Sequence, residues 1–164
     1  MRYEHLVQIN EPARPDIRPL SRTELWRGLV LRAARPELFD SSVDGTSTLE
    51  ESETSQLREV RRSGRSVTER VELTPESLVA ITAVSGSDLD GSRLEIRIEE
   101  PAPGALFVRF TYALSGAAVP TDEGERQALR QAYYFADLDT IRHIRVSTQD
   151  AERAAPAPDA PPAG

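Results

Sequence analysis

The sequence has 164 residues, 38% of them hydrophobic, which suits one globular domain and is short for two. It contains no cysteine, which excludes disulfides and thiolate chemistry, and its formal net charge of -7 argues against a nucleic-acid binder. No apolar run is long enough to span a membrane and the N-terminus is too polar for a secretory signal, so we predict a cytoplasmic protein without membrane insertion.

The N-terminal part predicts a strand followed by a helix. Residues 2–10 alternate between apolar and polar side chains, as a half-buried strand does, and a proline-rich stretch follows. Ser21 and Glu24 have the spacing of a capping box, so Ser21 should be the N-cap of a helix that ends before Pro36. The segment 36–39 is expected to form a second short turn.

Residues 42–114 predict six short strands separated by turns. Because connections this short cannot contain crossover helices, the strands should pair in antiparallel hairpins. The segment "REVRRSGR" (58–65) reads as a charged hairpin at an exposed sheet edge. The six alternating runs are 45–52, 56–62, 66–74, 77–84, 92–100 and 105–114.

The C-terminal part predicts one long helix over 122–146, with Asp122 as its N-cap. This helix is apolar nearly all round, which indicates either deep burial or a homodimer surface. Residues 150–164 are rich in Pro and Ala and should form a disordered tail, which leaves residues 1–149 as a single domain.

These elements together predict an α+β fold with a curved, seven-stranded antiparallel sheet. One face of the sheet is apolar, as residues 94–98 show with Leu94, Ile96 and Ile98 on one side. Only the long C-terminal helix is large enough to cover that face.

This order of elements resembles the helix-grip fold of the START-like, or SRPBCC (Bet v1-like), superfamily. More closely, the chain is similar to the AtaL-like family, formerly a domain of unknown function. The segments that carry the resemblance are "YEHLVQIN" (3–10), "TELWRGLVLRAARPELF" (23–39), "RVELTPE" (70–76), "IEEPAPGALFVRFTY" (98–112) and "AYYFADLDTIRHIR" (132–145).

The resemblance implies an apolar cavity between the sheet and the long helix, since members of the superfamily enclose lipids, polyketides or similar molecules. We therefore expect the protein to bind a hydrophobic small molecule. One alternative is a polyketide cyclase- or dehydratase-like enzyme, and another is a dimerising interaction protein with a filled core. The family brings no established catalytic motif, and neither the sequence nor the resemblance implies a cofactor.

Alternation within the strands and helical spacing identify the residues expected to line such a cavity. They are Val71, Leu73, Leu94, Ile96, Ile98, Val108, Phe110, Tyr112, Leu129, Tyr133 and Ala136.

Two of the inward positions are candidates for chemistry. Glu69 shares its side of the strand with Val71, where it would anchor a ligand or act as an acid or base, unless a strand end or bulge lets it reach water. Tyr112 offers a hydroxyl to a ligand carbonyl, or is a core tyrosine bonded to backbone or water.

The remaining polar candidates are weaker. His5 is either a general base or a satisfied core histidine, and His143 complements the dipole at the helix end. Two distant histidines make a histidine-based metal site improbable. Arg109 should face outward, unless a bulge near Gly104 turns it inward to bind a ligand carboxylate.

Overall fold

The computed structural model describes residues 1–156, and the predicted order of elements is confirmed. A strand is followed by two short helical segments, six further strands and one long helix. Their bounds are β1 (Arg2–Gln8), α1 (Arg22–Ala34), the 3-10 helix η1 (Pro36–Leu38), β2 (Val43–Glu51), β3 (Ser55–Arg62), β4 (Arg65–Thr74), β5 (Leu78–Ser85), β6 (Arg93–Glu99), β7 (Phe107–Ala113) and α2 (Glu123–Ala154).

The seven strands of the described chain form one antiparallel sheet in the order β1-β7-β6-β5-β4-β3-β2. Consecutive strands from β2 to β7 are neighbours, whereas β1 pairs with β7 at the far side. The sheet therefore has β1 and β2 as its edges. The predicted hairpin at 58–65 is confirmed, but β3 lies between β2 and β4, so the sequence misplaced the sheet edge by one strand.

Side-chain chemistry fixes both helix starts as predicted. The Ser21 hydroxyl accepts a hydrogen bond from the Glu24 N–H at 3.1 Å, and the Glu24 carboxylate accepts one from the Ser21 N–H at 2.8 Å. Asp122 caps α2 by accepting from the Glu125 N–H at 3.1 Å. Pro36 lies two residues after the last residue of α1 and opens η1.

The long helix extends further than the sequence predicted. It has 32 residues and ends at Ala154, so it is about 48 Å long at 1.5 Å per residue. The prediction of a disordered tail is therefore wrong for residues 150–154, where polar and small side chains continue the helix. Residues 157–164 lie outside the described part of the chain.

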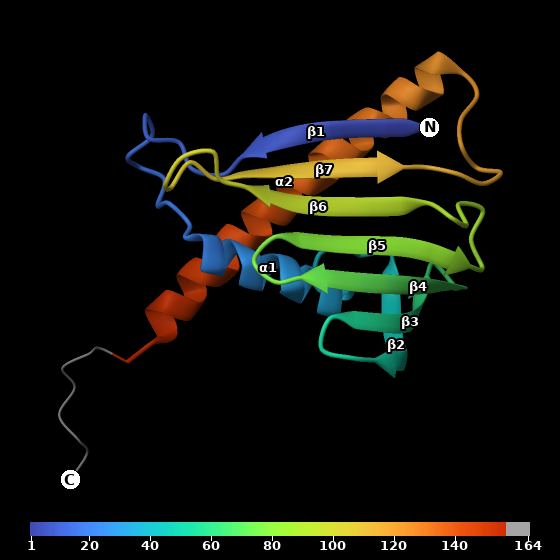
Figure 1. Ribbon diagram of the computed structural model, residues 1–164, viewed down its shortest axis with the longest axis horizontal. Coiled ribbons are helices and arrows are strands. Elements are labelled where there is room, and N and C mark those ends of the chain that lie inside the picture. Colours follow the sequence, from blue (N-terminus) through green and yellow to red (C-terminus); the bar gives the residue numbers. More distant parts are fainter. Residues whose placement is uncertain (157–164) are drawn as a thin grey trace, which may run out of the picture.

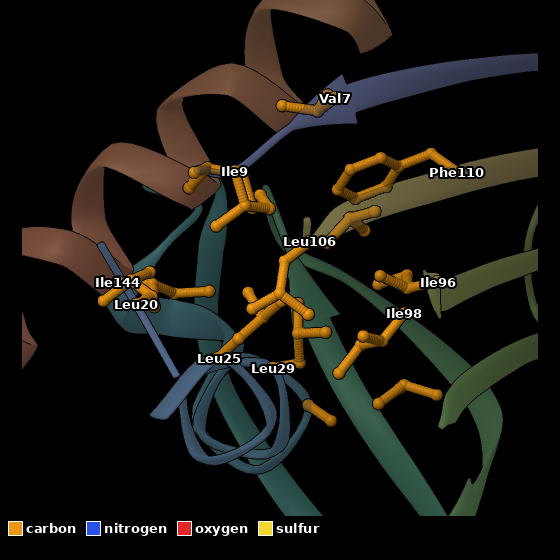
Figure 2. Packing of buried hydrophobic residues seen from close by; sticks show 14 of the residues in the cluster. Val7, Ile9, Leu20, Leu25, Leu29, Ile96, Ile98, Leu106, Phe110 and Ile144 are labelled. Carbon is orange, nitrogen blue, oxygen red and sulfur yellow. The ribbon is translucent and has the colours of Figure 1, made fainter. Parts of the chain in front are cut away.

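Both helices cover the same face of the sheet. Figure 1 shows α2 running diagonally behind β1, β7 and β6, with α1 beside its C-terminal half. In Figure 2, Leu25 and Leu29 of α1 point toward Leu106, and Ile144 of α2 lies beside Leu20. A residue of α1 without a side chain permits this approach of the two helices, because a Cβ on Gly28 would lie 2.4 Å from Ile144 Cγ2.

The inner face of β7 packs into this core. Val108 and Phe110 are fully buried in the hydrophobic cluster, and Tyr112 and Leu114 are nearly so, which confirms the predicted alternation. The part of the sheet under α1 and the C-terminal half of α2 is thus filled by side chains.

The middle of α2 is less buried than its apolar sequence suggested. Its buried residues are Asp137, Thr140, Ile141 and Ile144, while Phe135 is 55% exposed. The prediction of deep burial is therefore wrong for the side of α2 that contains Phe135. The homodimer surface remains a prediction.

Candidate functional site

A cleft of about 320 Å³ lies between the sheet and the long helix. Its walls come from α1, from the η1 segment, from β3 and β5, and from α2. The lining residues are Arg32, Pro36, Phe39, Asp40, Ser41, Arg58, Arg62, Ile81, Ala136, Asp139 and Thr140.

Two larger hollows lie elsewhere. One of about 580 Å³ is bordered by the proline-rich loop 10–19, the loop 103–105 and Phe107. The other, of about 390 Å³, is a groove between α1 and the C-terminal part of α2. Neither contains a side chain from the inner face of β3, β4 or β5, so the smaller cleft is the one that corresponds to the space between sheet and helix.

Arg58, which lines the cleft, belongs to a buried ion pair. The hairpin register places Arg58 of β3 directly opposite Glu69 of β4, so both side chains point to the inner face. Arg58 Nη2 lies 2.9 Å and Nε 3.3 Å from Glu69 Oε2, and the guanidinium also donates to the Ala33 carbonyl. Arg58 is 2% exposed and Glu69 is 7% exposed. Glu69, whose Oε1 also lies 3.5 Å from Arg62 Nη2, is thus paired and largely buried.

The other charges of the cleft lie nearer its mouth. Arg62 Nη1 is 2.5 Å from Asp40 Oδ2, and Asp139 Oδ1 is 2.5 Å from Arg142 Nη1. Burial by itself would raise the pKa of the Asp40 carboxyl, but hydrogen bonds from the Ser42 hydroxyl and N–H, and then the nearby Arg62, lower it below its ordinary value. Arg32 approaches Thr140, with its Nε 3.4 Å from the hydroxyl.

A second polar cluster lies between β1, β7 and α2. The Tyr112 hydroxyl donates a hydrogen bond to Asp137 Oδ2 at 2.8 Å, and His5 Nε2 lies 3.0 Å from the same oxygen. The histidine contact has the distance of an ion pair but lacks the alignment of a hydrogen bond. His5 Nδ1 and Asp137 Oδ1 have no hydrogen-bond partner among the described residues, although both atoms are buried.

Burial and the negative charge of Asp137 act in the same direction on the tyrosines of this cluster. Burial first, and then Asp137, raise the pKa of the Tyr112 hydroxyl far above its ordinary value, while the charge of Arg32 opposes them. The same two causes raise the pKa of Tyr133, whose ring stacks on Tyr112 with centroids 4.2 Å apart. These hydroxyls therefore stay protonated in the folded protein at neutral pH.

The predicted lining residues are divided among three places. Ala136 lines the cleft, whereas Val71 and Leu73 line a smaller hollow of about 160 Å³ beside α1. The others lie in the hydrophobic core or pack against it, namely Leu94, Ile96, Ile98, Val108, Phe110, Tyr112, Leu129 and Tyr133.

Arg109 faces outward, as the simpler alternation predicted. Its Nε lies 2.6 Å from Glu99 Oε1, and its Nη1 lies 3.2 Å from Glu4 Oε1. The pairing of β7 with β1 and with β6 has no register shift, so the bulge that would turn Arg109 inward does not occur.

Sequence reasoning missed Arg58, Arg32 and Asp137. The register of Arg58 could have been predicted, because a two-residue turn at Ser63 and Gly64 places residues 58 and 69 opposite each other. Both turn residues have positive φ, 46° and 79°, as a type I′ turn requires. Asp137 gave a weaker signal. Residues 136 and 137, three and four positions after Tyr133, both lie on the same side of the helix as Tyr133, so the helical spacing does not single out Asp137.

Residues 1–156 contain no group of three or more acidic, histidine or cysteine side chains that could hold a metal ion. In the same residues, no helix is both long and apolar enough to cross a membrane.

Comparisons with known proteins agree with this architecture. The family described as "Acetylaranotin biosynthesis cluster protein L" (AtaL) matches residues 7–151. A comparison with curated proteins found no match.

Several solved structures share the fold at low sequence identity. The Zhui aromatase/cyclase from Streptomyces sp. R1128 has a TM-score of 0.62 and 15% identity over 94% of this chain and 96% of its own. The di-domain aromatase/cyclase StfQ from the steffimycin pathway has a TM-score of 0.66 and 12% identity, over 93% of this chain and 52% of its own. Ara h 8.0201 has a TM-score of 0.59 and 12% identity over 88% of this chain and 97% of its own. The chain therefore belongs to the AtaL family and has a Bet v1-like helix-grip fold.

Proposed function

We propose that this protein binds a hydrophobic small molecule, of lipid- or polyketide-like character, in the cleft between its sheet and its long helix. The observation that supports this most is the cleft itself, whose volume of about 320 Å³ lies at the small end of the range for ligand sites. Pro36, Phe39, Ile81 and Ala136 give it apolar surface, and five charged and two hydroxyl-bearing side chains form the rest of its lining. The apolar side chains would hold the body of a ligand, and the polar groups around them would fix its orientation.

Two features favour binding over the alternatives. His5, Tyr112 and Asp137 are the groups best suited to acid–base chemistry, but none of them is among the described residues that line the cleft. A molecule in the cleft would therefore meet arginine, aspartate, hydroxyl and apolar groups rather than these. An interaction protein with a filled core would need no cleft under its helix, so the open space supports a ligand instead.

The experiment is a titration with N-phenyl-1-naphthylamine, a neutral probe whose fluorescence rises in apolar surroundings. Ala136→Trp places an indole inside the cleft, so we expect it to weaken probe binding about tenfold or more, equivalent to about 1.4 kcal/mol. Ala128→Trp is the matched control, because Ala128 is an exposed alanine of the same helix outside the cleft. We expect it to bind the probe like the wild type.

The proposal fails if the wild-type protein does not enhance the fluorescence of the probe. It also fails if Ala136→Trp binds the probe as tightly as Ala128→Trp does, since the probe would then occupy another part of the surface. Circular dichroism of each variant ensures that lost binding is not lost folding.

A further inference from the structure

One cation of the cleft has no anionic partner in the described chain. Arg32 extends from α1 into the cleft and is partly buried, and the contact that the structure gives it is the Thr140 hydroxyl, 3.4 Å from its Nε. The Nη groups of its guanidinium form no ion pair with a carboxylate of residues 1–156.

The other charges that line the cleft are compensated. Arg58 pairs with Glu69, Arg62 pairs with Asp40 and also lies 3.5 Å from Glu69, and Asp139 pairs with Arg142. Because these side chains together are neutral overall, Arg32 is the charge lining the cleft that has no ion-pair partner among residues 1–156. This is notable in a chain whose formal net charge is -7, where carboxylates are abundant.

The surroundings of Arg32 define what would complement it. Pro36, Phe39, Ile81 and Ala136 contribute apolar surface to the same cleft, so an occupant has an apolar body. A guanidinium presents two parallel N–H donors, which match the two oxygens of a carboxylate. We infer that the ligand is an amphiphilic carboxylic acid whose carboxylate binds Arg32 and whose apolar part lies against Phe39 and Ile81. This inference rests on the proposed function and specifies its ligand class.

A matched pair of competing ligands isolates the effect of the ligand's negative charge on binding. 2-Naphthoate and 2-naphthamide have nearly the same shape and apolar area, but only the first is an anion at neutral pH. Each is used to displace N-phenyl-1-naphthylamine from the full-length protein at low salt. A hydrogen bond to a charged group contributes roughly 1.5–3 kcal/mol, so we expect the wild type to prefer 2-naphthoate by about tenfold or more.

Arg32→Gln should remove this preference, so that both competitors act within about twofold of each other, while displacement by 2-naphthamide stays as in the wild type. Arg27→Gln is the control, since Arg27 is an exposed arginine of the same helix that faces the groove between α1 and α2. It should keep the full preference. If Arg32→Gln also loses displacement by 2-naphthamide, Arg32→Met replaces it, because methionine keeps the aliphatic stem.

The outcomes separate the two proposals. Failure of the neutral probe to bind the wild type overturns the proposed function and this inference together. If the probe binds normally but the acid and the amide displace it equally well, only the inference of a carboxylate ligand is overturned. The same follows if the preference for the acid persists in both Arg32 variants. Loss of the preference in the Arg32 variants alone supports the assignment.

Discussion

Replacing Glu69 with leucine is expected to lower the free energy of unfolding by about 3–5 kcal/mol, the cost of leaving one buried charge without its partner. Arg58 is 2% exposed and its guanidinium cannot lose its proton in a protein, so the charge would remain in the interior. The backbone carbonyl of Ala33 would remain as an acceptor but does not neutralise it. Urea unfolding followed by circular dichroism measures the loss.

Two comparisons make this test specific to the pair. The double variant Arg58→Met/Glu69→Leu should recover most of the lost stability, because it removes both charges and leaves apolar groups of similar size. Asp88→Leu breaks an exposed pair with Arg65, and we expect it to change stability by less than about 1 kcal/mol. A Glu69→Leu variant as stable as Asp88→Leu would contradict the buried pair.

Replacing Tyr112 with phenylalanine is expected to lower the free energy of unfolding at pH 7 by about 1.5–3 kcal/mol, since the buried hydroxyl donates to a carboxylate. Asp137 Oδ2 would keep only the poorly aligned contact with His5. Tyr134→Phe is the matched control at a more exposed ring and should keep the wild-type stability at pH 7.

The same tyrosine predicts how stability depends on alkaline pH. Burial and Asp137 raise its pKa in the folded state above the unfolded value, which is about 10. The folded protein therefore holds this proton more tightly, and the stabilisation is fully present below pH 10 and is lost as the pH rises above it. For one such group, the free energy of unfolding falls by about 1.4 kcal/mol for each pH unit in this range.

Tyr112→Phe should therefore lose less stability between pH 10 and pH 11.5 than the wild type does. Some pH dependence will remain, because the pKa values of Tyr3 and Tyr133 are raised for similar reasons. Urea unfolding at a series of pH values tests this. Parallel stability profiles for the wild type and Tyr112→Phe would show that this hydroxyl is not buried against Asp137.

The sequence predicted the strands and helix starts well because local rules govern them. Alternation identified all seven strands, and the capping residues Ser21 and Asp122 fixed where the helices begin. The end of α2 was predicted poorly, because no glycine or proline stops the helix before Pro156 and its last turns contact little of the core. The pattern of buried residues therefore gave no indication of where this helix ends.

The candidate site was harder to predict, for reasons that depend on distance in the sequence. Glu69 was identified as an inward carboxylate, but its partner Arg58 appeared to be part of a charged edge. Asp137 was missed because a buried carboxylate on an apolar helix is explained only by Tyr112 and His5, which belong to other elements. The volume of the cleft depends on how far α1 and α2 stand from the sheet, which residue patterns do not determine.

The most direct test of the central claim is to observe which methyl groups respond to N-phenyl-1-naphthylamine in a carbon–proton NMR spectrum of the full-length protein. Ile81 and Ala136 line the proposed cleft, Leu31 lines the groove between the helices, and Ile17 lines the hollow beside the proline-rich loop. Binding between sheet and long helix predicts shifts for Ile81 and Ala136 with Leu31 and Ile17 unchanged. Shifts confined to Leu31 or Ile17, or no shifts at saturating probe, would contradict it.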